Sequence, residues 1–142
     1  MLPTDQVGDE EILYRNVRWK YCDTSTPGVI RLSPEAFFDP QRRPSVDRGV
    51  LCNHDPSHTQ LGNDGVAVLI ACQVRKIDDV LLLAPVRTFR VDVEPKPLHS
   101  NPAHAQVFLD PSSNNDKVFR RLRTSLARIA NSHPWAIEPI PE

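Results

Sequence analysis

The stretch TFRVDVEPKPLHSNPAHAQVFL, residues 88–109, decides the fold because it holds two alternating patterns separated by a proline-rich connection. In the first pattern Phe89, Val91 and Val93 alternate with charged residues, and in the second Ala105 and Val107 are small or apolar residues at every other position. A period of two places alternate side chains on one face of a β-strand. We therefore predict strands over 88–94 and 103–109 that pair across an eight-residue connection.

Residues 114–133, NNDKVFRRLRTSLARIANSH, predict the longest helix. Their apolar residues recur at helical spacing, and Asn114 or Asn115 can cap the first turn. The stripe expected to face the core is Val118, Phe119, Leu122, Leu126, Ile129 and Ala130. The opposite face is basic and is expected to be solvated, with Lys117, Arg120, Arg121, Arg123 and Arg128.

A second, shorter helix is predicted near residues 33–39, in the sequence SPEAFFD. Ser33 is suited to the N-cap and Pro34 to the first helical position, where a missing N–H costs nothing. The prolines that follow limit this helix to about two turns. Phe37 and Phe38 are the expected core anchors.

Other strands are expected over 11–21, around 45–51 and over 65–77, the last because β-branched residues recur in GVAVLIACQVRKI. Together these elements predict an α+β fold. It consists of a small, mostly antiparallel sheet packed by one long C-terminal helix and by the short helix near 33–39.

The chain of 142 residues has the size of one domain. We expect a flexible N-terminus over 1–10, a single α+β domain over 11–132 and an extended, proline-rich tail over 133–142. The 14 prolines are about twice the average usage of roughly 5% and mark where regular structure ends.

The charge balance excludes a broad electrostatic attraction to nucleic acid, because 17 basic residues face 18 acidic ones. No apolar run approaches the roughly 20 residues of a membrane helix, so no membrane partner is expected. The three cysteines have no disulfide-framework spacing, which favours reduced thiols and a cytoplasmic location.

Three residues are candidates for catalysis. His104 lies between alanines on a predicted strand and can carry a proton near neutral pH. Ser45 lies between arginines in RRPSVDR; it can contact an anion or substrate, but as a nucleophile it has no evident base in the sequence. Arg31 offers a planar fork suited to phosphate or carboxylate.

Five further residues are candidates for ligand binding. Arg15 and Arg48 present guanidinium groups next to predicted turns. Ser33 and Asn101 are local hydrogen-bond formers, and His99 lies in the connection before the last predicted strand. The alternative for every arginine is an ion pair with one of the equally numerous acids.

Cys52, His54 and His58 form a C-x-H-x3-H pattern of residue types that bind zinc, with Cys22 or His99 available as a fourth ligand. The pattern matches no common zinc module, so a polar loop without metal is the preferred interpretation. The sequence also lacks a glycine-rich phosphate loop, and we expect no cofactor.

Four segments together resemble an uncharacterised group of small bacterial proteins: LYR at 13–15, RLSPEAFFD at 31–39, PSVDR at 44–48 and NPAHAQV at 101–107. The shared pattern is Y-R, R-x-S-x-x-A-F, S-V and N-P-A-H-A. The resemblance implies a bacterial protein and one site, whose members would be Arg15, Arg31, Ser33, Phe37, Ser45, Asn101 and His104. A weaker likeness is to ADP-ribosyltransferase folds, through the order of Arg15, Ser45 and Glu94, although the S-T-S and E-x-E motifs of those folds are absent.

Two functions from different classes remain open. The first is a protein with one polar Arg/Ser/His site that binds or acts on a nucleotide-like or other anionic ligand. The second is a non-catalytic interaction module with a protein partner, such as a toxin–antitoxin or defence-cassette component. The sequence does not decide whether the protein is an enzyme.

Overall fold

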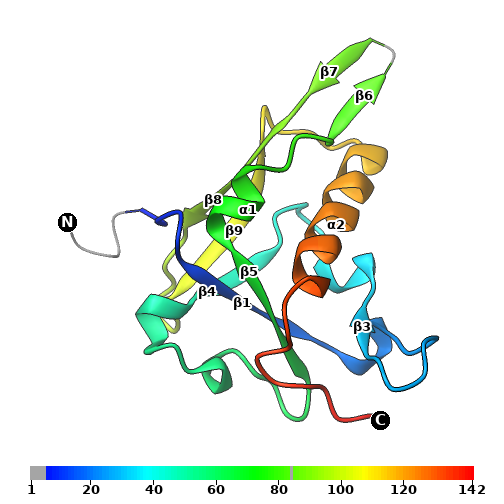
Figure 1. Ribbon diagram of the computed structural model, residues 1–142. Coiled ribbons are helices and arrows are strands. Elements are labelled where there is room, and N and C mark those ends of the chain that lie inside the picture. Colours follow the sequence, from blue (N-terminus) through cyan, green and yellow to red (C-terminus); the bar gives the residue numbers. More distant parts are fainter. Residues whose placement is uncertain (1–5, 84) are drawn as a thin grey trace.

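The structure, a computed structural model, describes residues 6–83 and 85–142 and is built on a five-stranded antiparallel sheet (Figure 1). The strand order is β5-β1-β4-β9-β8. The bounds are Ile12–Val17 for β1, Ser45–Arg48 for β4, Gly65–Ile70 for β5, Arg90–Pro95 for β8 and His104–Asp110 for β9. One long helix, α2, covers Asp116–Asn131. The predicted α+β class, with its mostly antiparallel sheet and long C-terminal helix, is confirmed.

Smaller elements connect these strands. Two strand pairs lie outside the main sheet: β2 (Cys22–Asp23) with β3 (Arg31–Leu32), and β6 (Leu81–Leu83) with β7 (Val86–Thr88). The described residues also form single-turn 3-10 helices: η1 (Trp19–Tyr21), η2 (Pro34–Phe37), η3 (Gly49–Cys52) and η4 (Pro56–His58). A short α-helix, α1, covers Ala71–Arg75.

The hairpin predicted from residues 88–109 is present as β8 and β9. Val91 lies opposite Leu109 and Val93 opposite Val107, and all four side chains are buried. The alternation therefore has the expected cause, because one face of each strand packs in the core. The turn between the strands is closed by reciprocal backbone hydrogen bonds of 3.1 and 3.0 Å between Leu98 and Asn101.

Helix α2 buries its apolar stripe in the main core. Asn115 caps it, since its side-chain oxygen accepts hydrogen bonds from the backbone N–H groups of Lys117 (2.9 Å) and Val118 (3.1 Å). The predicted basic face requires one correction: Arg123 is only 9% exposed. Its guanidinium donates to both carboxylate oxygens of Glu35, each at 3.0 Å, and this pairing allows its burial.

The short helix near 33–39 is present as η2, but it differs from the prediction in two details. Ser33 makes no side-chain capping hydrogen bond. Phe37 is fully buried as expected, whereas Phe38 is 51% exposed. The prediction of a core anchor is therefore confirmed for Phe37 and wrong for Phe38. A helix of one turn directs only a narrow stripe into the core, which is why adjacent phenylalanines diverge.

The strand expected over 65–77 ends at Ile70, where the chain turns directly into α1. Val74 of α1 is buried against the core, and Arg75 donates to Asp92 of β8 at 2.7 Å and to Asp9 at 2.6 Å. Helix α1 thus contacts the two edge strands, β5 and β8, and tertiary packing overrides the β preference of the segment.

Both ends of the described chain contact the sheet. Residues 1–5 of the N-terminal segment predicted to be flexible lie outside the described residues; within 6–10, the Val7 side chain is buried. In the tail, Ile137 pairs with Val66 of β5, and the Trp135 indole donates to the carbonyl of Ile30 at 2.8 Å. No helix in the described part of the chain has the length and apolar character that crossing a membrane requires.

Candidate functional site

A cleft of about 440 Å³ lies over the outer face of strands β1, β4 and β9. Its floor is set by strand register: Tyr14 lies opposite Asp47, and Asp47 lies opposite His104. Residues that are direct cross-strand partners point to the same side of a sheet. Three neighbouring strands therefore present a tyrosine, a carboxylate and an imidazole in one row.

Loops and single-turn helices form the walls of this cleft. Segment η2 with the residue after it contributes Glu35, Ala36 and Phe38, and the loop at η4 contributes His58 and Thr59. The remaining lining residues are Arg15, Asn16, Arg18, Tyr21, Ser45, Val46, Leu61 and Asn101. The site thus combines groups from segments that are far apart in sequence.

Asp47 is the buried carboxylate of the cleft, with 8% of its surface exposed. One oxygen accepts a hydrogen bond from the Thr59 hydroxyl at 2.8 Å, and the other accepts one from the Asn101 amide at 2.8 Å. The His58 Nε2 atom lies 3.0 Å from the Asn101 side-chain oxygen and 4.0 Å from an Asp47 oxygen. In the described part of the chain, no lysine or arginine pairs with this carboxylate, which is unusual for a buried acid.

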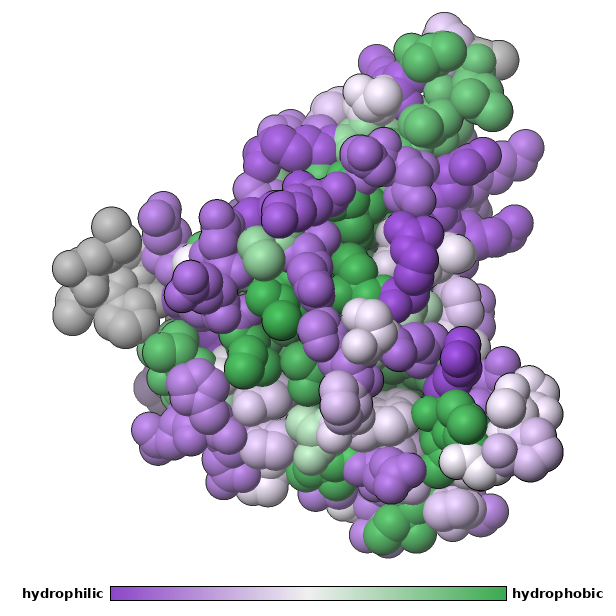
Figure 2. Space-filling model, viewed as in Figure 1, coloured by the Kyte–Doolittle hydropathy of each residue, from purple (hydrophilic) through white to green (hydrophobic). Residues whose placement is uncertain are grey.

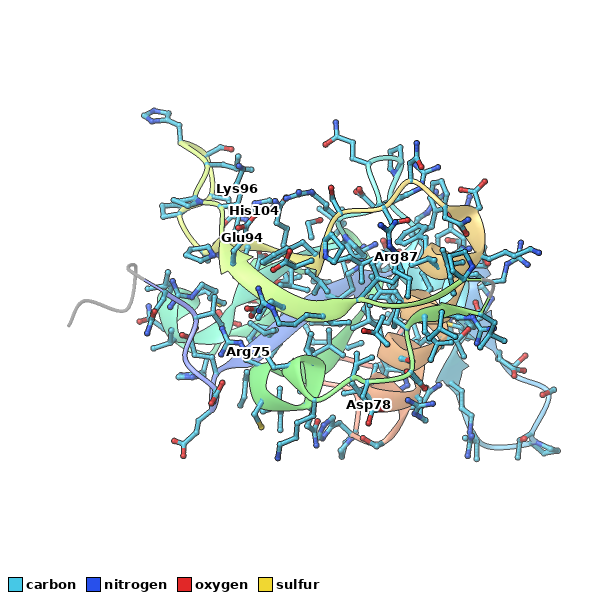
Figure 3. The ribbon with its side chains drawn as sticks, turned by 90° about the horizontal axis from the view of Figure 1, so that it is seen from above. Arg75, Asp78, Arg87, Glu94, Lys96 and His104 are labelled. Carbon is cyan, nitrogen blue, oxygen red and sulfur yellow. The ribbon has the colours of Figure 1, made fainter. Side chains whose placement is uncertain are left out.

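His104 is held on β9 by a hydrogen bond between its Nδ1 atom and the backbone carbonyl of Lys96, at 2.9 Å. A carbonyl only accepts, so Nδ1 carries the proton and Nε2 of the neutral ring is left as an acceptor. Figure 3 shows His104 close to Lys96 and Glu94 at this end of the sheet. This tautomer suits proton uptake at Nε2.

Arg15 lines the cleft, but its donors are used by the fold. The guanidinium donates to the carbonyls of Ala36 (3.0 Å), Ser45 (2.8 Å) and Phe38 (3.2 Å). The β1–β4 pairing stops at Tyr14 and Asp47, so Arg15 satisfies a carbonyl that no strand neighbour reaches. Burial lowers the pKa of this guanidinium from its ordinary value. Arg15 ties η2 to β4 and so shapes one wall.

Ser45 lies in the same cleft, where its hydroxyl accepts a 3.3 Å hydrogen bond from Arg15. A serine nucleophile needs a base within hydrogen-bond reach. Among the described residues, no histidine or carboxylate bonds to this hydroxyl. The arrangement gives Ser45 the means to contact a ligand, and its catalytic role stays a prediction.

Four of the predicted site residues are brought together in the cleft: Arg15, Ser45, Asn101 and His104. The other four lie elsewhere. Arg31 is exposed on β3, His99 is exposed in the β8–β9 turn, and the Ser33 backbone N–H donates to the Tyr21 carbonyl at 2.8 Å. The expected convergence of Arg31 with Ser45 and His104 does not occur, because β3 pairs only with β2, outside the main sheet.

Arg48 is directed to the opposite side of the sheet from the cleft. Its side chain is fully buried, and it donates to Glu11 at 2.8 and 2.7 Å and to the Gln6 carbonyl at 2.8 Å. The one-residue offset from Asp47 explains this, because successive side chains in a strand point to opposite faces. Arg48 therefore supports the fold, and its donors are not available to a ligand in the cleft.

Sequence reasoning missed Asp47, His58 and Arg18 as members of the site. A signal for Asp47 was present, since it follows Ser45 by two residues on a strand and must share its face. Nothing local indicates that His58 and Asn101, 43 residues apart, meet at 3.0 Å. That contact depends on how the loop 49–64 folds over the sheet.

Within the described part of the chain, the structure does not group the residues of the C-x-H-x3-H pattern as metal ligands. The Cys52 thiol is buried and contacts the carbonyls of Arg48 and Gly49, both at 3.5 Å. Burial, followed by the nearby Asp47 charge, raises the pKa of this thiol, which disfavours the thiolate that zinc requires. Across residues 6–83 and 85–142, no group of three or more His, Cys, Asp and Glu side chains is placed to hold a metal ion.

No protein-family model, curated protein or solved structure matches this chain. The resemblance to small bacterial proteins, stated from sequence motifs, therefore stays a prediction.

Proposed function

We propose that the cleft over β1, β4 and β9 binds a small anionic, nucleotide-like ligand, and that Asp47, His58 and His104 are the groups able to exchange protons with it. The observation that carries this proposal is the row of Tyr14, Asp47 and His104 across three central strands, with His58 at 4.0 Å from the Asp47 carboxylate. Strands hold side chains more rigidly than loops do, which favours a preorganised site.

The dimensions and lining of the cleft suit a molecule of this class. A volume of about 440 Å³ lies within the range of small-molecule sites, roughly 300–1,000 Å³. Tyr21 and Phe38 supply aromatic surface for a flat ring, whereas Tyr14 is only 5% exposed, and the other lining residues are mostly polar. A ligand with both a ring and hydrogen-bonding groups uses both kinds of surface.

The charges assign an orientation to the ligand. Arg18 is exposed at the cleft, and within the described residues its guanidinium has no hydrogen-bond or ion-pair partner, so it is available for an anionic group. Glu35 is already paired with Arg123. Asp47 repels an anion but accepts hydrogen bonds from hydroxyls, as acidic residues do from ribose in dinucleotide sites. The anionic end should therefore lie at Arg18 and the hydroxyl-bearing part over Asp47.

Proton exchange is the chemistry that the floor can add to binding. Neutral His104 presents Nε2 as an acceptor, and imidazole is the side chain most often used as a general acid or base. His58 has the same capacity and is oriented by Asn101. Both rings can serve as general acid or base for a ligand seated above Asp47.

Calorimetric titration with adenosine monophosphate, ribose 5-phosphate and inorganic phosphate tests the proposal. The nucleotide should bind most tightly, because it alone uses the ring surface, Asp47 and Arg18 together. Arg18→Gln should weaken nucleotide binding by roughly tenfold, the effect of losing one charge-assisted contact. Arg31→Gln, an exposed arginine outside the cleft, is the matched control and should bind as the unmodified protein does.

Two results would overturn the proposal. One is the absence of binding by all three ligands at millimolar concentration. The other is an equal loss of affinity in Arg18→Gln and Arg31→Gln, which would show a general charge effect rather than a site.

A further inference from the structure

The β6–β7 hairpin projects from the body of the protein beyond the start of α2 (Figure 1). Leu83 is 67% exposed and Val86 is 74% exposed, and the two lie opposite each other in the hairpin. Figure 2 shows apolar residues gathered at this projecting end. Large aliphatic side chains exposed together leave apolar surface that a partner can cover.

The two faces of this hairpin differ. Leu82 lies opposite Arg87, and Leu82 packs against the main core, so this face is turned towards the body of the protein. Leu83 and Val86 are one residue further along each strand and therefore point to the other face. The apolar pair is thus directed outward by strand geometry and cannot be covered by the core.

A basic group lies next to this hairpin. Lys117, Arg120 and Arg121 line a groove of about 400 Å³ on the exposed side of α2, and α2 contacts β6. In the described part of the chain, none of these three side chains forms an ion pair. Asp79, the acid in the groove, accepts a hydrogen bond from Ser125 at 2.8 Å and pairs with Arg128 at 3.2 Å.

Nearby acids offset only part of the positive charge of this surface: the pKa of the Asp116 carboxyl is lowered first by its hydrogen bond to Arg42 and then also by the charge of Arg120. Asp116, at the start of α2, is paired with Arg42 at 2.8 Å. Asp78 is exposed, but Figure 3 shows it well apart from Arg87. The surface therefore combines three cations that form no ion pair with an exposed aliphatic pair, in a chain whose formal net charge is -1.

We propose that this surface, formed by Leu83, Val86, Lys117, Arg120 and Arg121, docks an acidic, partly apolar segment of a partner protein. Charge complementarity requires an anionic partner, and the aliphatic pair requires one that also brings apolar side chains. A nucleic-acid duplex meets only the first requirement, because its backbone offers phosphates and no apolar side chains. Single strands are recognised by aromatic stacking, and the described residues of this hairpin include no aromatic. This docking surface is separate from the ligand cleft and does not depend on it.

Fluorescence anisotropy with a synthetic sixteen-residue peptide of alternating glutamate and leucine tests the proposal on the full chain. A peptide with serine in place of leucine and a DNA duplex of sixteen base pairs are compared under the same salt conditions. The glutamate–leucine peptide should bind at least roughly tenfold more tightly than the glutamate–serine peptide, since only the first covers the aliphatic pair.

Variants separate the two halves of the surface. Leu83→Ser/Val86→Ser should abolish the preference for the leucine peptide, and Arg120→Gln/Arg121→Gln should weaken both peptides. Val29→Ser/Arg31→Gln is the matched control, because Val29 is 41% exposed and Arg31 is exposed, both away from this surface. The control should bind both peptides unchanged.

Three outcomes would overturn the proposal. Duplex binding as tight as that of the leucine peptide, weakened only by the arginine variant, would indicate nucleic acid instead. A dimer in light scattering that Leu83→Ser/Val86→Ser dissociates would make a second copy of this chain the occupant. Equal binding of both peptides would remove the apolar half of the proposal. Circular dichroism confirms that each variant is folded.

Discussion

Replacing Arg48 by methionine should destabilise the protein strongly while leaving ligand binding in the cleft intact. Arg48 is fully buried and makes two hydrogen bonds to the Glu11 carboxylate, at 2.8 and 2.7 Å, and one to the Gln6 carbonyl at 2.8 Å. The Glu11 side chain is itself only 14% exposed. Removing the guanidinium leaves this carboxylate buried without its cation, and such a loss costs about 3–5 kcal/mol.

The magnitude is large against a total stability of about 5–15 kcal/mol for an ordinary domain, so urea unfolding monitored by tryptophan fluorescence measures it directly. Arg31→Met is the control, because an exposed arginine with no ion pair in the described part of the chain should change the free energy of unfolding by at most about 0.5 kcal/mol. The double variant Arg48→Met/Glu11→Met should recover much of the loss, since no unpaired buried charge remains. Recovery stays incomplete because Glu11 also accepts a hydrogen bond from the Gly8 backbone N–H at 2.6 Å.

A loss below about 1 kcal/mol for Arg48→Met would refute this reasoning. So would weakened adenosine monophosphate binding in a variant that remains folded, because it would return Arg48 to the ligand-binding role expected from sequence. If Arg48→Met does not fold, Arg48→Lys keeps the charge while losing the bidentate geometry and allows the same comparison.

Two further predictions concern stability. Burial alone would raise the pKa of Asp92, but hydrogen bonds from Arg75, the Val93 backbone and Arg90 outweigh it and hold the pKa below its ordinary value of 3.8. The stability from these bonds is therefore present above about pH 4 and is lost as the pH falls through the folded-state pKa. Asp92→Asn should lower the free energy of unfolding by about 1 kcal/mol in urea at pH 7. A loss that did not shrink in strongly acidic solution would contradict the assignment. Gly65→Ala should cost about 1–3 kcal/mol, because its Cβ atom would lie 2.9 Å from both Pro139 and Trp135 of the tail. Gly8→Ala, whose Cβ would meet nothing nearer than 3.6 Å, is the control, and equal effects of the two substitutions would count against the packing of the tail on β5.

The parts of the fold that sequence predicted are those whose information is local. The alternation in β8 and β9 and the apolar stripe of α2 each repeat over several residues, so one buried face can be assigned without knowing its partner. Periodicity could not assign the segment 65–77, because a continuous apolar run fits a buried strand and a helix equally well. The chain is helical after Ile70, and this helix places the Val74 side chain in the core.

Half of the eight predicted site residues lie in the cleft, and strand periodicity explains two of them. Ser45 and His104 lie on strands, and strand periodicity alone puts them on a common side of the sheet once β4 and β9 pair. Arg31 and His99 lie on a small strand pair and a turn, whose placement no periodicity indicates. His58 was visible as a polar loop residue, but its contact with Asn101 requires the folded loop.

What the sequence determined by itself is the α+β class, the β8–β9 pairing and the amphipathic helix α2, because these follow from periodicities of two and 3.6 residues along one segment. What only the tertiary structure decided is the role of each polar group. Asp47 and Arg48 are adjacent in sequence, yet one forms the floor of the cleft with Thr59 and Asn101, and the other is buried with Glu11. The physical reason is that a charged side chain takes its role from the groups that meet it across space, and those groups come from distant parts of the chain.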